Sequence, residues 1–354
     1  MNVQTRTRSG LVAVTAVAAL ILAACNGSAD DDATGEKTSD ASESAPADNE
    51  GAADDEEAVD GPAVEVTDMG GDTVQIPADP QSIIATDNRI FGTLAEWGVE
   101  LSAAPIDLMP AGEEKLAVYM ENADVVNIGN HREPDMEVFI TAQPDLVLNG
   151  QRFSQYEDDI RELVGDAAFV DTDIDIENSR IDDQLRELTT LLGDIFGHQS
   201  DAEQLIADFD ASIERASDAY DPEETVVGLL TSGGSINYVA PVTGRAIGPI
   251  YDVLGLTPAL DRDGSTNHQG DDISVEAIAD ADPDWIIVLD RDAGAGTEGA
   301  ASARELIADS EALANVSAVK EGKIIYLDPN FYTAEDIQHY TELFNAMADA
   351  FEDK

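Results

Sequence analysis

The sequence predicts an α/β protein of two similar lobes, each a mainly parallel sheet flanked by helices, which one long helix connects. The first observation is that short apolar runs alternate with amphipathic segments along the globular part of the chain, as they do in βα units. The second is a pattern that occurs twice: a helix, a Pro-Asp pair, an apolar strand and then an arginine. The third is a long amphipathic helical pattern between the two copies.

Residues 1–25 are predicted to be an export signal. Two arginines precede an apolar run from Leu11 to Ala24, which is long enough for a signal sequence and too short to cross a bilayer comfortably. Cys25 is the only cysteine, so it cannot form an internal disulfide. Leu-Ala-Ala-Cys after such a run resembles the bacterial lipobox, which implies a diacylglycerol anchor on Cys25 at the outer face of the cytoplasmic membrane. The alternative is a plain signal peptide or an anchor helix that contains a cysteine.

Residues 26–61 form a low-complexity segment of Asp, Glu, Ala, Ser and Gly with almost no aliphatic residue. Such a segment cannot bury enough apolar area to offset the entropy of ordering. We therefore expect an acidic, disordered tether that holds the globular part away from the membrane.

The chain is strongly acidic, with 74 Asp and Glu against 18 Lys and Arg and a formal net charge of -56. A charge of this sign opposes binding to nucleic acid and to anionic membrane surfaces. The acidic residues are spread along the chain, which is typical of a halophilic, acidic proteome, because salt screens their repulsion. The few arginines that follow regular elements therefore stand out as candidate partners for an anion.

The N-terminal lobe is predicted to span residues 62–197. Within it, the pair Pro144-Asp145 leads into an apolar strand over residues 146–149, and Arg152 lies just beyond the strand. In open α/β sheets, ligands bind beyond the carboxyl ends of the strands. Arg152 is therefore well placed to meet a ligand, and Arg89, which also follows a predicted strand, is a further candidate.

The connecting helix is predicted over residues 198–221. Leu205, Ile206, Phe209 and Ile213 give it one apolar face. Ser200 is the expected N-cap, because Glu203 follows three residues later, as in a capping box. A stiff helix of this length could link the two lobes.

The C-terminal lobe is predicted to span residues 222–354 and repeats the pattern of the first. Pro283-Asp284 precedes an apolar strand over residues 285–289, and Arg291 follows it. Arg152 and Arg291 each come eight residues after their proline. This repetition predicts two similar lobes that each offer an arginine from an equivalent strand end.

Three further residues lie where predicted elements begin or end. Arg245 precedes an apolar helical turn, His268 lies in a polar loop, and Tyr332 follows the last predicted strand. Each has an ordinary alternative: a surface charge, a surface histidine or a packed tyrosine. The remaining histidines share no metal-ligand spacing and are interpreted as structural or surface residues: His131, His198 and His339.

These features resemble the class III substrate-binding lipoproteins of ABC importers, and within that group the ferric catecholate siderophore binders of the petrobactin and tetradentate-catecholate type. The similarity covers about residues 64–352. It depends on these motifs: Pro144-Asp145-Leu146 with Arg152, Gly244-Arg245 before residues 251–255, Thr266-Asn267-His268, Pro283-Asp284 with Arg291, and residues 323–329 with Tyr332.

The resemblance implies that Arg152, Arg245 and Arg291 bind the anionic ferric complex, and that His268 and Tyr332 are possible ligands of its iron. Guanidinium groups are planar, permanently charged and weakly hydrated, which suits a partly desolvated anion. Imidazole and phenolate are competent ligands for iron(III).

The chain departs from the family pattern in two ways. The loop of His268 is one residue longer than usual, and the tyrosine lies one residue nearer Asp328-Pro329, with the Ser/Gly-rich segment after it replaced by Thr333-Ala334-Glu335-Asp336.

The same resemblance implies no intrinsic cofactor and no turnover, with a membrane permease and its ATPase as partners. Glu96 and Glu276, one on a predicted helix of each lobe, are candidate permease contacts.

Cobalamin, haem or ferric hydroxamate are the alternative ligands, but they need more aromatic stacking than a chain with 5% aromatic residues offers. No Gly-x-Ser-x-Gly, His-Glu-x-x-His or P-loop pattern supports a secreted enzyme. The absence of a histidine cluster disfavours a zinc or manganese binder, and the paired arginines disfavour a purely structural lipoprotein.

Overall fold

The structure is a computed structural model that describes residues 63–176 and 178–353. The predicted export signal (1–25) and acidic tether (26–61) lie outside these residues. Within the described ranges, no helix combines the length and apolar character needed to cross a bilayer.

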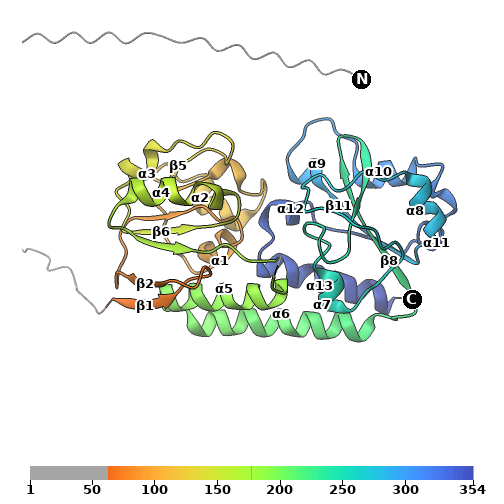
Figure 1. The fold of residues 1–354 in the computed structure, drawn as a ribbon, viewed down its shortest axis with the longest axis horizontal. Helices are drawn as coiled ribbons and strands as arrows, with labels where there is room; N and C mark the ends of the chain where they lie inside the picture. The colour runs from red at the N-terminus through yellow and green to blue at the C-terminus, as the bar shows by residue number, and fades with distance from the viewer. Residues whose placement is uncertain (1–62, 177, 354) are drawn as a thin grey trace, which may run out of the picture. The chain divides into compact units, whose positions relative to one another are not determined.

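The first sheet has five parallel strands in the order β5-β4-β3-β6-β7 (Figure 1). Alternate residues of its strands face opposite layers: Ile84 and Val147 pack with the helices α3 and α4, whereas Leu148 packs with α1 and α5. An antiparallel hairpin of β1 and β2 precedes the sheet. The elements are β1 Val64–Thr67, β2 Thr73–Ile76, β3 Ile83–Ala85, α1 Phe91–Glu96, β4 Ala103–Ala104, α2 Ala117–Met120, β5 Val126–Asn127, α3 Glu137–Thr141, β6 Leu146–Asn149, α4 Glu157–Val164, β7 Ala168–Asp171 and α5 Ile181–Phe196.

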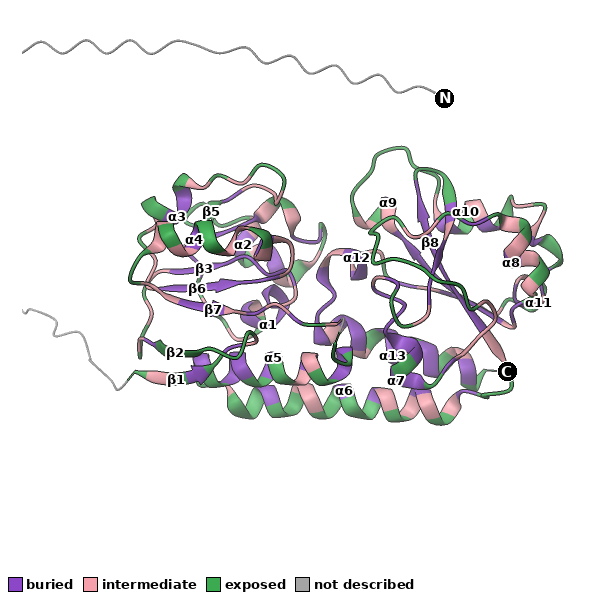
Figure 2. Ribbon diagram, viewed as in Figure 1, coloured by how far each residue is buried: buried purple, intermediate pink, exposed green. Residues whose placement is uncertain are grey.

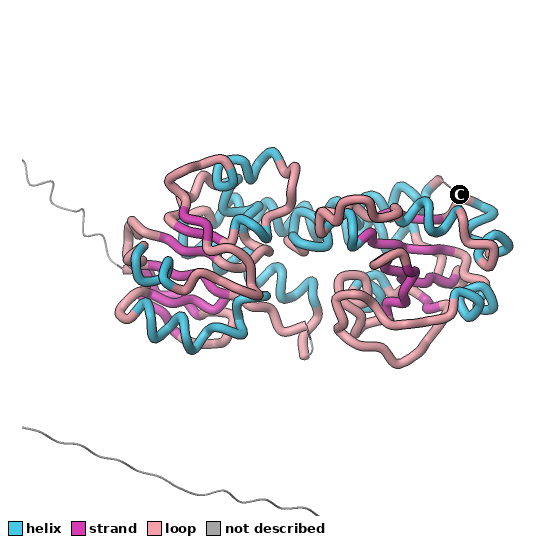
Figure 3. The backbone as a smooth tube through the Cα atoms, turned by 90° about the horizontal axis from the view of Figure 1, so that it is seen from above, coloured by secondary structure: helices cyan, strands magenta, loops and turns pink. Residues whose placement is uncertain are grey.

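The second sheet has the order β10-β8-β11-β12, with parallel pairing, and β9 pairs with β8 in the antiparallel direction. One face packs with α8, α10 and α11, and the other with α7 and α13. Figure 3 shows the strands of each sheet gathered together among helices, and Figure 2 shows that the strands are largely buried. The elements are β8 Thr225–Ser232, β9 Ser235–Val239, α7 Ile250–Leu254, β10 Thr257–Pro258, α8 Val275–Ala281, β11 Trp285–Asp290, α9 Arg291–Gly294, α10 Ala303–Ala308, α11 Ser317–Glu321, β12 Ile324–Tyr326, α12 Phe331–Ala334 and α13 Ile337–Glu352.

A long helix, α6 (Gln199–Ala219), runs along the base of both sheets in Figure 1. It packs against α5 and α13, and the rings of Phe209 and Phe344 lie 5.9 Å apart. The fold class predicted from the sequence is therefore confirmed. The predicted cap of this helix is wrong: His198 is the N-cap residue, without a side-chain hydrogen bond. Gly197 ends α5 in a left-handed conformation, and α6 begins two residues later, before Ser200.

The repeated Pro-Asp pair has the same structural role in both sheets. The carboxylate of Asp145 accepts a hydrogen bond of 3.1 Å from the backbone N–H of Ser82, just before β3. The carboxylate of Asp284 accepts one of 2.8 Å from the backbone N–H of Thr225, at the start of β8. In each sheet the aspartate precedes one strand and anchors the beginning of its parallel neighbour, so the sequence repetition reflects an equivalent sheet position.

Candidate functional site

A cavity of about 250 Å³ lies beyond the carboxyl ends of β3, β6 and β7 in the first sheet, and residues from the second half of the chain line its other side. Arg89 and Arg152, which follow β3 and β6 of the first sheet, line it together with Arg245 and Glu335 from the second half of the chain. Two of the three predicted ligand-binding arginines, and the further candidate Arg89, thus meet at one cavity, the place where open α/β sheets bind ligands.

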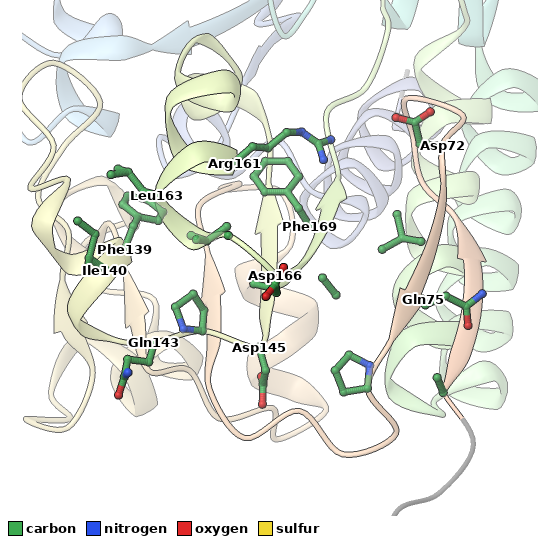
Figure 4. A pocket seen from close by; sticks show the side chains of 18 of the residues that line it. Asp72, Gln75, Phe139, Ile140, Gln143, Asp145, Arg161, Leu163, Asp166 and Phe169 are labelled. Carbon is green, nitrogen blue, oxygen red and sulfur yellow. The ribbon is translucent and has the colours of Figure 1, made fainter.

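A larger cavity, of about 1040 Å³, lies elsewhere on the first lobe, between the hairpin and α4 (Figure 4). Asp145 and Phe169 line it, which places it beside the amino-terminal ends of β6 and β7. None of the predicted site residues lines this cavity. We therefore assign the functional site to the smaller cavity, where the charged side chains converge.

The position of Arg152 depends on a close backbone approach. Arg152 lies in the 3₁₀ turn η3 (Gln151–Tyr156) directly after β6. A Cβ atom on the preceding Gly150 would lie 2.4 Å from Oδ2 of Asp87 and 2.7 Å from Oγ1 of Thr172. Only glycine fits there, so the turn that carries Arg152 starts tightly against the neighbouring strand ends.

Glu335 is a site residue that sequence reasoning missed. Its carboxylate accepts a hydrogen bond of 2.9 Å from Nε of Arg245 and one of 3.2 Å from Nε2 of Gln151, and it lies 3.5 Å from Nη2 of Arg89. Its side chain is only 6% exposed. The sequence feature that could have indicated it is segment 333–336, which contains Glu335 and Asp336 where the resemblance implied Ser and Gly.

Burial and mutual charge set the ionisation of this cluster. Burial and the neighbouring charge of Arg245 lower the pKa of Arg152 to about 10. Burial opposes the charge of Glu335, but Arg245 and Arg89 outweigh it and hold the pKa of the carboxyl below its ordinary value. Burial likewise opposes the charge of Arg245, and Glu335 outweighs it, so the pKa of that guanidinium is raised. These groups are therefore ionised at neutral pH.

Tyr332 lies between two arginines. The guanidinium carbons of Arg245 and Arg291 lie 5.2 Å and 5.4 Å from the centre of its ring, within the range of cation–π attraction. Its hydroxyl oxygen accepts a hydrogen bond of 3.2 Å from Nε of Arg291, whose Nη1 lies 3.2 Å from Oδ1 of Asp292. Arg291 is the first residue of α9, directly after β11, and thus occupies the strand-end position equivalent to that of Arg152.

His268 is exposed, and its charged neighbours are cleft arginines. Partial burial, then Arg291 and Arg245, lower the pKa of its imidazole. His131 shares this environment, because burial, Arg152 and also His268 lower the pKa of its imidazole.

The other two histidines have structural partners. His198 stacks on Trp97 with ring centres 5.1 Å apart, and Nδ1 of His339 lies 2.6 Å from Oδ1 of Asp336. Among the residues that the structure describes, no group of three or more His, Cys, Asp or Glu is arranged to hold a metal ion. The arginines of the cavity lining and the ring of Tyr332 beside Arg245 make the site cationic and partly aromatic.

Comparison with known proteins identifies the family of the chain. A family model described as periplasmic binding protein matches residues 83–331. The ferric-anguibactin-binding protein FatB of Vibrio anguillarum is 32% identical over 268 residues, which are 73% of this chain and 77% of that protein. The petrobactin-binding protein YclQ of Bacillus subtilis is 22% identical over 286 residues, or 78% of this chain and 84% of that protein.

Solved structures share the fold. The crystal structure of a TroA-like periplasmic binding protein from Xylanimonas cellulosilytica matches with a TM-score of 0.66 at 29% identity, covering 82% of this chain and 97% of the other. That of YclQ matches with a TM-score of 0.70 at 21% identity, covering 82% of this chain and 99% of the other. The fold is thus common to this chain and these proteins.

Proposed function

This chain belongs to the periplasmic binding protein family, and we propose that it captures a ferric siderophore of the anionic catecholate type and delivers it to the permease of an ABC importer. Members of the family carry substrates without converting them, so the chain is not an enzyme. The observation that carries the proposal is the convergence of Arg89, Arg152 and Arg245 on one cavity in a chain of net charge -56. Relatives named for ferric anguibactin and petrobactin support the same ligand class.

The proposed role of the arginines is to donate hydrogen bonds to catecholate oxygens. Charge-assisted bonds from guanidinium to oxyanions are short and strong, and they gain strength in a partly desolvated cleft. Nε of Arg89 is buried and has no hydrogen-bond partner among the described residues, so it is a spare donor. Arg291 donates a hydrogen bond to Tyr332, whose ring also lies near the cavity-lining Arg245. We retain His268 and Tyr332 as proposed ligands for coordination sites on the iron that the siderophore leaves open.

The proposal is tested by quenching of the fluorescence of Trp97 and Trp285 in the chain without residues 1–25, in high salt. We expect quenching by ferric catecholate complexes and none by ferric hydroxamate or cobalamin, the alternative ligands. Arg152→Ala, Arg245→Ala and Arg291→Ala should each weaken binding by about tenfold or more, because each removes a charge-assisted bond. Arg161→Ala is the matched control, since Arg161 pairs with Glu157 on the surface of α4. Binding of a control ligand but not of the catecholates would overturn the proposal.

We further propose that Cys25 anchors the protein to the outer face of the cytoplasmic membrane. The support is the lipobox-like sequence Leu22-Ala23-Ala24-Cys25 after an apolar run. Cys25→Ser should move the protein from the membrane fraction to the soluble fraction of cells that express it. An unchanged distribution would contradict the lipid anchor.

We also propose that Glu96 and Glu276 contact the permease. Both are exposed; Glu96 ends α1 and Glu276 lies in the first turn of α8, one in each lobe. The double variant with both residues changed to Gln should bind the ferric complex normally but fail to support uptake. Normal uptake by cells that carry this variant would contradict the assignment.

A further inference from the structure

We propose that Glu335 is a specificity residue, whose buried carboxylate remains among the cleft arginines and restricts the cleft to ferric complexes of small net negative charge. The inference rests on the proposed function, because it names the kind of ferric complex that the same cleft accepts. It depends on three observations: the contacts of Glu335, the charge balance of the cavity lining, and the backbone that holds the carboxylate in place.

The contacts of Glu335 join the two halves of the cleft. Its carboxylate bonds to Nε of Arg245 from its own lobe, and to Gln151 and Arg89 from the other. A buried carboxylate that accepts bonds from two arginines has its desolvation compensated within the site. It therefore lowers the positive charge that the arginines present to a ligand.

The charge balance of the cavity lining follows directly. Three arginines line the cavity: Arg89, Arg152 and Arg245. Two carboxylates line it as well, Asp173 and Glu335. Three positive and two negative side chains leave one positive charge, enough to balance one negative charge on a ligand. A second pair nearby, Arg291 with Asp292, is neutral as a unit.

A ligand with several negative charges would meet an unfavourable environment here. Its charge in excess of one would be left uncompensated in a partly desolvated cleft, and it would be repelled by Glu335. A ferric complex of four catecholate oxygens carries one negative charge, whereas a complex of six carries three. The carboxylate of Glu335 can therefore discriminate against the triply charged complex without a steric barrier.

The backbone keeps Glu335 in place. Glu335 is the C-cap of α12, with a left-handed φ of 50°. The next residue, Asp336, is the N-cap of α13, and its carboxylate accepts a bond from the backbone N–H of His339. Because a helix ends and another begins on either side of it, Glu335 has little freedom to leave the cleft when a ligand enters.

The test compares two probes: iron(III) bound to a tetradentate bis-catecholate, and iron(III) bound to a hexadentate tris-catecholate. Quenching titrations at one fixed salt concentration give both dissociation constants for the protein and for Glu335→Gln. We expect the wild-type chain to prefer the singly charged probe. Glu335→Gln should shift the ratio of the two constants toward the triply charged probe by about tenfold or more. Glu342→Gln, an exposed charge change on α13, is the matched control and should leave the ratio unchanged.

A ratio that is the same in Glu335→Gln and in the wild type would overturn the inference while leaving the proposed function intact. Failure of the wild-type chain to bind either probe would overturn the proposed function instead. Glu335→Asp keeps the charge and should keep the wild-type preference, so it serves as the informative variant if Glu335→Gln does not fold. Loss of the preference in Glu335→Asp, measured on folded protein, would assign the effect to shape and contradict the inference.

Discussion

Nε of Arg291 donates a hydrogen bond of 3.2 Å to the hydroxyl oxygen of Tyr332. The bond holds the phenol of a buried tyrosine beside Arg291, the residue that directly follows β11. Arg245 lies over the same ring, so two of the three predicted ligand-binding arginines act together with the predicted iron ligand.

We first predict that Tyr332 contributes to the colour of the bound complex. Tyr332→Phe removes the phenol oxygen but keeps the ring between the arginines. The visible absorption band of the bound ferric bis-catecholate should shift, because one ligand of the iron is replaced by water. Arg152→Ala is the control: this cleft arginine is not one of the two that lie over the Tyr332 ring, so its loss should weaken binding without shifting the band of the saturated complex. An identical spectrum in Tyr332→Phe would show that the tyrosine does not ligate the iron.

The second prediction concerns the equivalent aspartates of the two sheets. Asp145→Ala and Asp284→Ala should each lower the free energy of unfolding by about 1–3 kcal/mol. The first leaves the backbone N–H groups of Gln81 and Ser82 without an acceptor, and the second leaves the backbone N–H and the hydroxyl of Thr225 without one. Urea denaturation followed by circular dichroism measures the loss. Asp166→Ala, an exposed aspartate of the same lobe, should change stability by no more than about 0.5 kcal/mol. A similar value for all three variants would contradict the anchoring role.

The third prediction is a pH dependence of stability that arises from His339. Burial opposes its charge, and Lys115 opposes it too, but Asp336 and Glu113 outweigh both and raise the pKa of the imidazole. Burial would raise the pKa of Asp336, but His339 outweighs it, so that pKa is lowered. The histidine therefore contributes stability that is fully present below its unfolded pKa of 6.5 and is lost as the pH rises through its folded pKa. The aspartate contributes stability that is lost as the pH falls below 3.8.

This pH dependence is tested by urea denaturation of the wild type and of His339→Gln between about pH 5 and about pH 9, which gives the free energy of unfolding of each. The wild type should be more stable by about 1–3 kcal/mol at the acidic end, and the difference should shrink as the pH rises. A difference that does not depend on pH would contradict the assignment of a charged pair.

The fourth prediction concerns the core between α6 and α13. The side chain of Phe344 is fully buried, and its ring lies 5.9 Å from that of Phe209 and 6.0 Å from that of Tyr340. Phe344→Ala should lower the free energy of unfolding by about 3–5 kcal/mol, because it leaves a cavity, whereas Phe344→Leu should cost less. Glu342→Ala, an exposed change on the same helix, is the control. Equal losses for the alanine and leucine variants would argue against a cavity at this position.

Much of the fold could be predicted from the sequence because the signals are local. The apolar runs of β6 and β11, each after a Pro-Asp pair, placed Arg152 and Arg291 at strand ends, as the structure has them. The apolar face of α6 also predicted this helix from the sequence. The N-cap of α6 could not be predicted in this way: Gly197 ends α5 and α6 begins two residues later, at Gln199, so the capping pattern of Ser200 and Glu203 lies inside the helix.

By itself, the sequence determined the alternation of strands and helices, the two lobes and the arginines at their strand ends, because periodicity and turn residues act over a few positions of the chain. The tertiary structure decided which charged residues contact those arginines. Glu335 meets Arg89 across 246 residues, and no local pattern encodes which charges a pair of folded lobes brings together. In the sequence, Glu335 is one of 74 acidic residues and nothing distinguishes it from an exposed one. In the folded chain it is buried and serves as the counter-ion of the cleft arginines.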